Sequence, residues 1–162
     1  MADTLSLRTL SPRPQPKIVT LLAIQNDRDE WLLYRRKKEP FAGLVGFPYG
    51  KIHLGETIEE AAGRELQEKT GLEATLRHAG DAYLTVRRGE GLLSHMLVHV
   101  FVGNQPRGEL TLQSSIGTCF WRAIEQVNPA DAMPGFLDLA AALKQESPAH
   151  FFHEFVYDSS HD

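Results

Sequence analysis

The pattern of apolar and polar positions predicts β-strands on both sides of one strongly marked helix. Branched apolar residues fill 17–25, the polar run 26–29 predicts a turn, and 31–36 predicts a second strand. We expect these two strands to pair as a hairpin. Further apolar runs predict strands at 74–86, 96–102 and 119–122, and an amphipathic helix at 135–145.

The helix signal is strongest over residues 58–70. Thr57 and Glu60 have the spacing of a capping box, and acidic residues crowd the first turn, where the helix dipole favours them. Gly71 stands where a left-handed residue would end the helix. Glu60 and Arg64 are four residues apart, which predicts an ion pair on the outer face of this helix.

The inward face of the same helix is charged in its second half. At about 100° per residue, Glu65 falls within the apolar arc, and Glu68 and Lys69 flank it. An ionised carboxylate taken out of water without a partner costs several kcal/mol. Two convergent carboxylates suit a hard cation such as Mg²⁺. The alternative is a helix at the rim of the core, with an i,i+4 ion pair between Glu65 and Lys69.

Composition indicates one globular core with an extension at each end. The 162 residues are 42% hydrophobic and 23% charged, without an apolar run long enough to suggest a membrane partner. We expect a flexible arm at 1–16, a domain at 17–146, and an aromatic tail at 147–162. The tail should pack on the domain or on a second subunit, which would make a homodimer.

The net charge and the N-terminal segment indicate which partners and which cellular location to expect. The formal charge of −4 gives no basic footprint for nucleic acid, so any nucleotide bound would be a small molecule. The N-terminal segment is rich in proline and lacks the apolar core of a secretion signal. Cytoplasmic residence is therefore expected.

Cysteine and histidine offer little chemistry in this sequence. Cys119 is the one cysteine, which excludes an intramolecular disulfide and a cysteine-based zinc cluster. It lies in a short apolar strand pattern, which favours a buried structural thiol over a nucleophile. The seven histidines include no HExxH motif, and the one HxxxH spacing, His95 to His99, falls in an apolar strand pattern. We interpret His95 and His99 as exposed or half-buried strand residues.

The stretch 50–72, GKIHLGETIEEAAGRELQEKTGL, resembles the Nudix box, Gly-x5-Glu-x7-Arg-Glu-U-x-Glu-Glu-x-Gly-U, where U is aliphatic. The residues that match in register are Gly50, Glu56, Arg64, Glu65, Leu66, Glu68, Gly71 and Leu72. Lys69 departs from the pattern, because the family has a second glutamate there. The resemblance implies the α/β Nudix fold, an α/β/α sandwich with a mixed sheet between helices.

The resemblance also implies a reaction and the residues that perform it. The reaction is hydrolysis of a nucleoside diphosphate linked to another moiety, in which water attacks phosphorus with Mg²⁺, or alternatively Mn²⁺, as cofactor. Glu65 and Glu68 correspond to catalytic and metal-binding carboxylates, and the backbone carbonyl of Tyr49 to a further metal ligand. The remaining box positions, Gly50, Glu56, Arg64 and Gly71, correspond to structural residues, with Arg64 and Glu56 as an ion pair.

Substrate choice is weakly encoded. Arg36 and Lys51, from the strand and loop that flank the site, are interpreted as phosphate-binding residues, with surface solubility as the other reading. Phe47, Tyr49 and Tyr83 are candidates for stacking on a base, with core packing favoured for Phe47. In the loop 103–117 only Glu109 is acidic, and we interpret it as solvated. The downstream proline of ADP-ribose hydrolases and the tyrosine of diadenosine polyphosphate hydrolases are both missing.

Lys69 leaves three functions open. A lysine at this position repels a metal ion and competes for Glu65. The favoured hypothesis is a hydrolase that retains activity through Glu65 and Glu68, with Lys69 contacting a phosphate or turned to solvent. The second is a Nudix-fold module that binds or senses a nucleotide with impaired or no hydrolysis. The third is an interaction protein that oligomerises through its aromatic tail.

Overall fold

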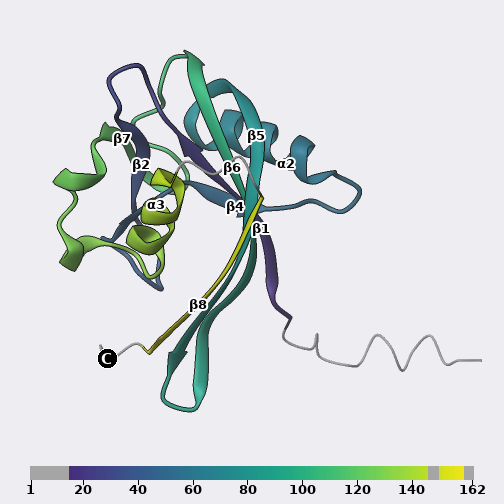
Figure 1. Cartoon of the computed structure of the whole chain (residues 1–162), viewed down its shortest axis with the longest axis vertical. Helices are drawn as coiled ribbons and strands as arrows, with labels where there is room; N and C mark the ends of the chain where they lie inside the picture. The colour runs from purple at the N-terminus through teal and green to yellow at the C-terminus, as the bar shows by residue number, and fades with distance from the viewer. Residues whose placement is uncertain (1–14, 146–149, 159–162) are drawn as a thin grey trace, which may run out of the picture.

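Two β-sheets form the centre of the molecule (Figure 1). The computed structural model describes residues 15–145 and 150–158. One sheet is five-stranded and mixed, in the order β4-β1-β6-β5-β8, and the other is three-stranded, in the order β3-β2-β7. The strands are β1 (Lys17–Ile24), β2 (Trp31–Arg36), β3 (Val45–Gly46), β4 (Tyr49–Lys51), β5 (Leu72–Arg88), β6 (Gly91–Gly108), β7 (Gly117–Arg122) and β8 (Phe151–Asp158).

Two helices cover opposite faces of the five-stranded sheet, as Figure 1 shows: α2 (Ile58–Thr70) and α3 (Phe136–Lys144). The alternation of β1 explains this arrangement, because successive side chains point to opposite faces. Leu22 packs in the cluster that contains Leu66 of α2. Val19 packs in the cluster that contains Leu139 of α3. The expected mixed sheet between helices is confirmed. The 3₁₀ helices η1 (Ile124–Gln126) and η2 (Pro129–Asp131) precede α3.

The predicted hairpin between β1 and β2 is wrong. The turn exists, but beyond it the two strands share only the isolated bridge between Gln25 and Trp31. β1 pairs with β4 and β6, whereas β2 pairs with β3 and β7. Each strand is thus an interior strand of its own sheet, with a neighbour along both edges and apolar residues on both faces. The turn residues in the sequence located the reversal of the chain but could not identify the strands with which β1 and β2 pair.

The helix α2 begins and ends as predicted. The Thr57 side chain accepts a hydrogen bond from the Glu60 N–H, and Gly71 ends the helix with φ of 77°. The second predicted helix is α3, which starts one residue later than expected. Within the described residues, neither helix has the length and apolar content needed to cross a membrane.

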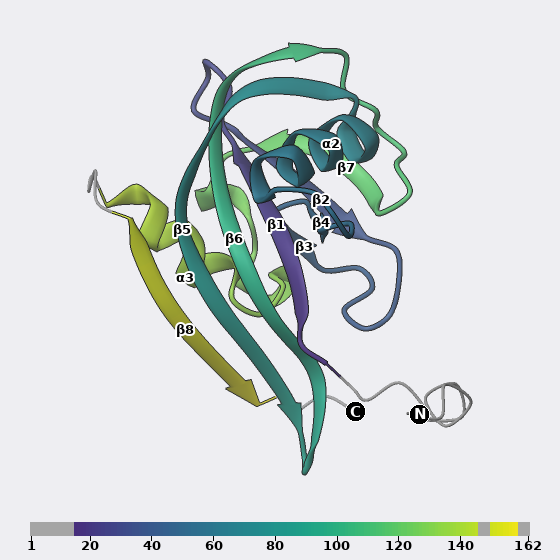
Figure 2. The same ribbon diagram turned by 90° about the vertical axis from the view of Figure 1, so that its right-hand side faces the viewer.

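β5 and β6 form a long hairpin that was not predicted. β5 extends two residues beyond the predicted strand at each end, and β6 runs for 18 residues where only 96–102 was predicted. β8 lies parallel to β5, and Figure 2 shows these strands side by side, extending past α2. Along β8 half-buried residues such as Phe155 alternate with exposed ones such as Val156. The expected arm at 1–16 lies almost wholly outside the described residues, as do 146–149 and 159–162 of the remaining chain.

Candidate functional site

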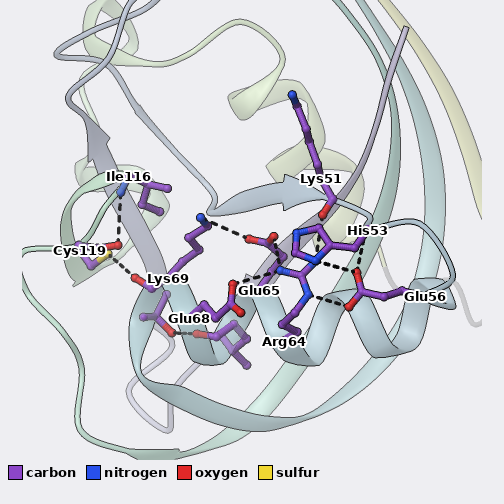
Figure 3. Close-up of polar contacts among 12 residues, drawn as sticks. Lys51, His53, Glu56, Arg64, Glu65, Glu68, Lys69, Ile116 and Cys119 are labelled. Atoms are coloured by element: carbon purple, nitrogen blue, oxygen red, sulfur yellow. Dashed lines mark hydrogen bonds and ion pairs between the residues drawn. The ribbon is translucent and has the colours of Figure 1, made fainter.

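Glu65 lies against the backbone of Gly50, at the point where α2 passes strand β4 (Figure 3). The Glu65 residue is only 3% exposed. A Cβ atom on residue 50 would lie 2.0 Å from Oε2 of Glu65. No side chain can occupy that position without moving the carboxylate, so the glycine permits the close approach.

Arg64 joins the loop, strand β4 and both candidate carboxylates (Figure 3). Its Nε and Nη2 donate to the two oxygens of Glu56 at 2.6 and 2.8 Å. Its Nη1 donates to Glu65 at 2.8 Å and to Glu68 at 3.1 Å, and Nη2 also donates to the Lys51 carbonyl at 3.0 Å. One guanidinium therefore fixes the relative positions of the loop, the strand and the helix.

The contacts of Arg64 include the predicted ion pair with Glu56 and correct another prediction. It was expected on the outer face in an ion pair with Glu60, but its side chain is only 19% exposed and its ion pairs among the described residues are with Glu56, Glu65 and Glu68. The long side chain reaches around the helix toward three carboxylates, whereas a helical projection places it by its Cα alone.

The contacts of Arg64 also keep the carboxylate of Glu56, in the loop before α2, ionised. The hydrogen bond from Arg64 is the largest cause that lowers the pKa of Glu56 to about 2, and partial burial opposes it. The His53 backbone N–H, which donates to Glu56 at 2.7 Å, lowers the pKa further. Glu56 is therefore ionised throughout the physiological range, and it also raises the pKa of Arg64.

One oxygen of the buried carboxylate lacks a donor. Oε2 of Glu65 is buried and accepts no hydrogen bond from the described residues. The Lys69 Nζ lies 3.9 Å from it, which allows charge attraction but exceeds hydrogen-bond length. A buried anionic oxygen without a partner is costly, so this atom suits a cation ligand. Arg64 Nη1 also contacts Glu68, whose side chain is 53% exposed, so the carboxylates of Glu65 and Glu68 lie close together.

The Tyr49 carbonyl points away from β1. The Leu22 N–H donates to the Pro48 carbonyl, so that pair is hydrogen-bonded and the next pair, which includes Tyr49, is not. Two residues further, the Lys51 carbonyl points the same way and accepts from Arg64 on α2. The predicted carbonyl ligand therefore lies on the side of β4 that α2 occupies.

A cleft of about 390 Å³ opens beside Glu65. Its lining includes four cationic side chains, Arg36, Lys38, Lys51 and Lys69, together with His53 and the loop residues Ser115 and Ile116. The cleft brings the two predicted phosphate-binding residues together with Glu65. Sequence reasoning missed Lys38, Ser115 and Ile116, since a charged turn and a polar loop carry no chemical signature of their own. The surplus of positive charge suits an anionic ligand.

Arg36 and Tyr49 form one wall of the cleft. The Arg36 Nη1 contacts the Tyr49 hydroxyl at 3.2 Å, and its Nε donates to the carbonyls of Lys38 and Pro40 at 2.9 and 2.7 Å. These contacts hold the guanidinium over the cleft. They also order the loop that carries Lys38.

Other sequence candidates lie elsewhere. Glu109 is exposed and does not line the cleft. Phe47 is buried in the core, with its ring centroid 4.9 Å from that of Phe136, and Tyr83 contacts Phe152 instead of the cleft. Cys119 is buried, and burial raises the pKa of its thiol, as expected for a structural residue.

Comparison with known proteins places this geometry in a family. A family model described as NUDIX domain matches residues 14–143. An ADP-ribose pyrophosphatase of Methanocaldococcus jannaschii is 37% identical over 79 residues, which are 49% of this chain and 46% of that protein. An 8-oxo-dGTP diphosphatase of Escherichia coli K12 is 44% identical over 50 residues, which are 30% of this chain and 39% of that protein. The matches thus span less than half the length of these curated relatives.

A solved structure shares the whole architecture. A MutT protein from Bacillus halodurans superimposes with a TM-score of 0.71 at 23% identity, covering 90% of this chain and 93% of that chain. At this identity the likeness concerns the fold alone. Because the family model covers most of the chain and includes the complete box, the chain belongs to the Nudix family.

Proposed function

We propose that the protein is a metal-dependent hydrolase of a nucleoside diphosphate linked to another moiety, with Mg²⁺ or Mn²⁺ as its cofactor. The observation that carries the proposal is the buried carboxylate of Glu65, which lines a cleft with cationic side chains and whose Oε2 accepts no hydrogen bond from the described residues. One wall can hold a hard cation, and the others can hold phosphate oxygens. Both features are needed to hydrolyse a diphosphate.

The donors present fit a hard divalent cation. Glu65, Glu68 and the carbonyl of Tyr49 would hold it, since all three offer oxygen. When bound, the ion supplies charge neutralisation on the diphosphate and lowers the pKa of a ligated water.

The side chains of the protein perform the remaining steps. Arg36, Lys38 and Lys51 bind phosphate oxygens and orient the diphosphate. Glu65 or Glu68 accepts a proton of the attacking water as the water oxygen bonds to phosphorus. The bridging P–O bond breaks, and the departing phosphate group keeps the bridging oxygen with its electron pair. Arg64 contacts both carboxylates and positions them without touching the substrate.

A nucleotide-binding module is the second candidate, and two observations favour it. The Lys69 ammonium lies 3.9 Å from the oxygen that would ligate the metal. Among the described residues that line the cleft, Glu65 is the one carboxylate. Both features would weaken metal binding while leaving the cationic walls able to bind phosphates.

Turnover on a substrate panel separates the two functions. The panel contains ADP-ribose and 8-oxo-dGTP, which the names of the relatives suggest, together with nucleoside triphosphates, nucleotide sugars and dinucleoside polyphosphates. Release of phosphate, pyrophosphate or nucleoside monophosphate is measured with and without Mg²⁺ or Mn²⁺. Glu68→Gln is compared with Glu60→Gln, a matched control on the exposed face of α2.

A hydrolase requires turnover that depends on metal, survives in Glu60→Gln and falls at least a hundredfold in Glu68→Gln. Absence of turnover from folded protein, combined with thermal stabilisation by one of these nucleotides, would replace the hydrolase with the binding module.

A further inference from the structure

Three histidines surround one aspartate on the five-stranded sheet. Oδ1 of Asp81 lies 2.8 Å from His78 Nε2 and 2.7 Å from His99 Nδ1, and Oδ2 lies 2.9 Å from His150 Nε2. None of these four residues lines the cleft beside Glu65. This histidine cluster is therefore separate from the Nudix box, and the proposed function makes no use of it.

A β-bulge brings the cluster together. Asp81 and His99 lie directly opposite each other on β5 and β6. His78 precedes Asp81 by three residues, and in a regular strand it would point to the other face of the sheet. The register shifts between His78 and Gly80, so one extra residue returns His78 to the face of Asp81. His150 joins them from the residue just before β8.

The packing holds two of the rings in place. The His78 ring stacks on Phe101, a core residue, with centroids 5.1 Å apart and planes at 18°. His150 meets His78 edge-on at 4.6 Å. The His150 side chain is 48% exposed, so the cluster opens to solvent on that side. The donors are therefore oriented by the fold and are also accessible to an ion.

The donor chemistry differs from that of the cleft. One ligand atom each from His78, Asp81 and His150 lies within 4.8 Å of the others. Two imidazoles and one carboxylate with an open side form a donor set for Zn²⁺ and related first-row ions, whereas Mg²⁺ prefers oxygen throughout. We propose that His78, Asp81 and His150 bind a divalent transition-metal ion of the Zn²⁺ type, with His99 orienting the Asp81 carboxylate.

The positions of the three ligands imply that a bound ion stabilises the fold. His78 and Asp81 belong to β5, and His150 leads into β8, the last strand of the sheet. An ion shared between them ties the C-terminal strand to the domain. Zn²⁺ at a hundredfold excess over its Kd should therefore raise the Tm by about 5–10 °C.

Co²⁺ and Zn²⁺ test the site on the full chain, with excess Mg²⁺ present to compete for the cleft. Visible absorption of bound Co²⁺, and its loss on adding Zn²⁺, report the affinity and the number of sites. The variants are His150→Gln, which changes an exposed side chain, and His78→Gln. The matched control is His95→Gln, a half-buried histidine of β6 outside the cluster. Circular dichroism checks the folding of each variant.

We expect one equivalent of Co²⁺ in the wild type, in His95→Gln and in Glu65→Gln, and at least tenfold weaker binding in His150→Gln and His78→Gln. His99→Gln should weaken binding about tenfold through the orientation of Asp81. The proposal is overturned if the wild type binds neither ion, in which case the cluster is a hydrogen-bond network alone. It is overturned equally if binding survives in folded His150→Gln and disappears in Glu65→Gln, because the ion would then occupy the cleft.

Discussion

Replacing Lys69 should lower the Mg²⁺ concentration that the protein needs. The Lys69 Nζ lies 3.9 Å from Oε2 of Glu65, so a cation that binds this oxygen must displace the ammonium or bind against its repulsion. Two unit charges about 4 Å apart interact by about 1 kcal/mol in water and about 4 kcal/mol at an effective dielectric constant of 20. The Lys69 side chain is 26% exposed, so solvent screening places the effect at about 1–3 kcal/mol. That range corresponds to roughly 5- to 150-fold in Mg²⁺ affinity.

Two substitutions separate charge from ligation. Lys69→Gln removes the ammonium, and Lys69→Glu also supplies the carboxylate that the box specifies. The Mg²⁺ concentration for half-maximal thermal stabilisation should fall from wild type to Lys69→Gln and again to Lys69→Glu. The same order should hold for turnover on any substrate found. Lys37→Gln removes the same charge from an exposed residue outside the cleft lining, and should leave the Mg²⁺ requirement unchanged.

Thermal unfolding at a series of Mg²⁺ concentrations measures the Mg²⁺ affinity of each variant without requiring activity. An unchanged Mg²⁺ midpoint in both Lys69 variants would refute the reasoning, because it would mean that the ammonium moves to solvent at no cost.

Other substitutions test the site and the core. Gly50→Ala should reduce turnover at least tenfold, because its Cβ would lie 2.0 Å from Oε2 of Glu65; steady-state kinetics beside a Tm measurement checks this, and full activity would contradict it. The pKa of Glu56 is lowered from 4.5 to about 2 on folding, so its stabilising effect is complete above about pH 4.5 and is lost as the pH falls toward 2. Urea unfolding from pH 6 to pH 2.5 should therefore show a weaker acid dependence in Glu56→Gln. Leu66→Ala, at a residue 1% exposed, should cost about 2–5 kcal/mol in urea unfolding, and a loss below 1 kcal/mol would show that the core around α2 relaxes.

Local signals predicted the parts of the fold that depend on neighbours in sequence. The bounds of α2 follow from Thr57 and Gly71, whose capping interactions involve residues only a few positions away. The pairing of β1 could not be obtained in this way, because β6 lies far along the chain and a run of apolar residues does not specify its partner.

The same distinction between local and distant contacts applies to the candidate site. The box identified Glu65, Glu68 and the pair of Arg64 with Glu56 because their spacing is local, whereas the projection of a helix placed Arg64 on the outer face beside Glu60. The cluster around Asp81 was missed because its histidines come from distant parts of the chain: β5, β6 and the residue just before β8. It also depends on a bulge that reverses the face of His78, and no spacing rule for metal ligands contains such a feature.

Arg64 has five N–H donors, and the structure directs all five to oxygens of the protein. It therefore keeps no N–H free for a phosphate, and a lysine, with three donors from one nitrogen, cannot reproduce its contacts. Its acceptors lie on the loop, on strand β4 and on α2, so a substitution that shifts one of these segments also shifts the other two. A double-mutant cycle between Glu56 and Glu68 should accordingly show an interaction energy, although the side chains make no direct contact, because both depend on the same guanidinium.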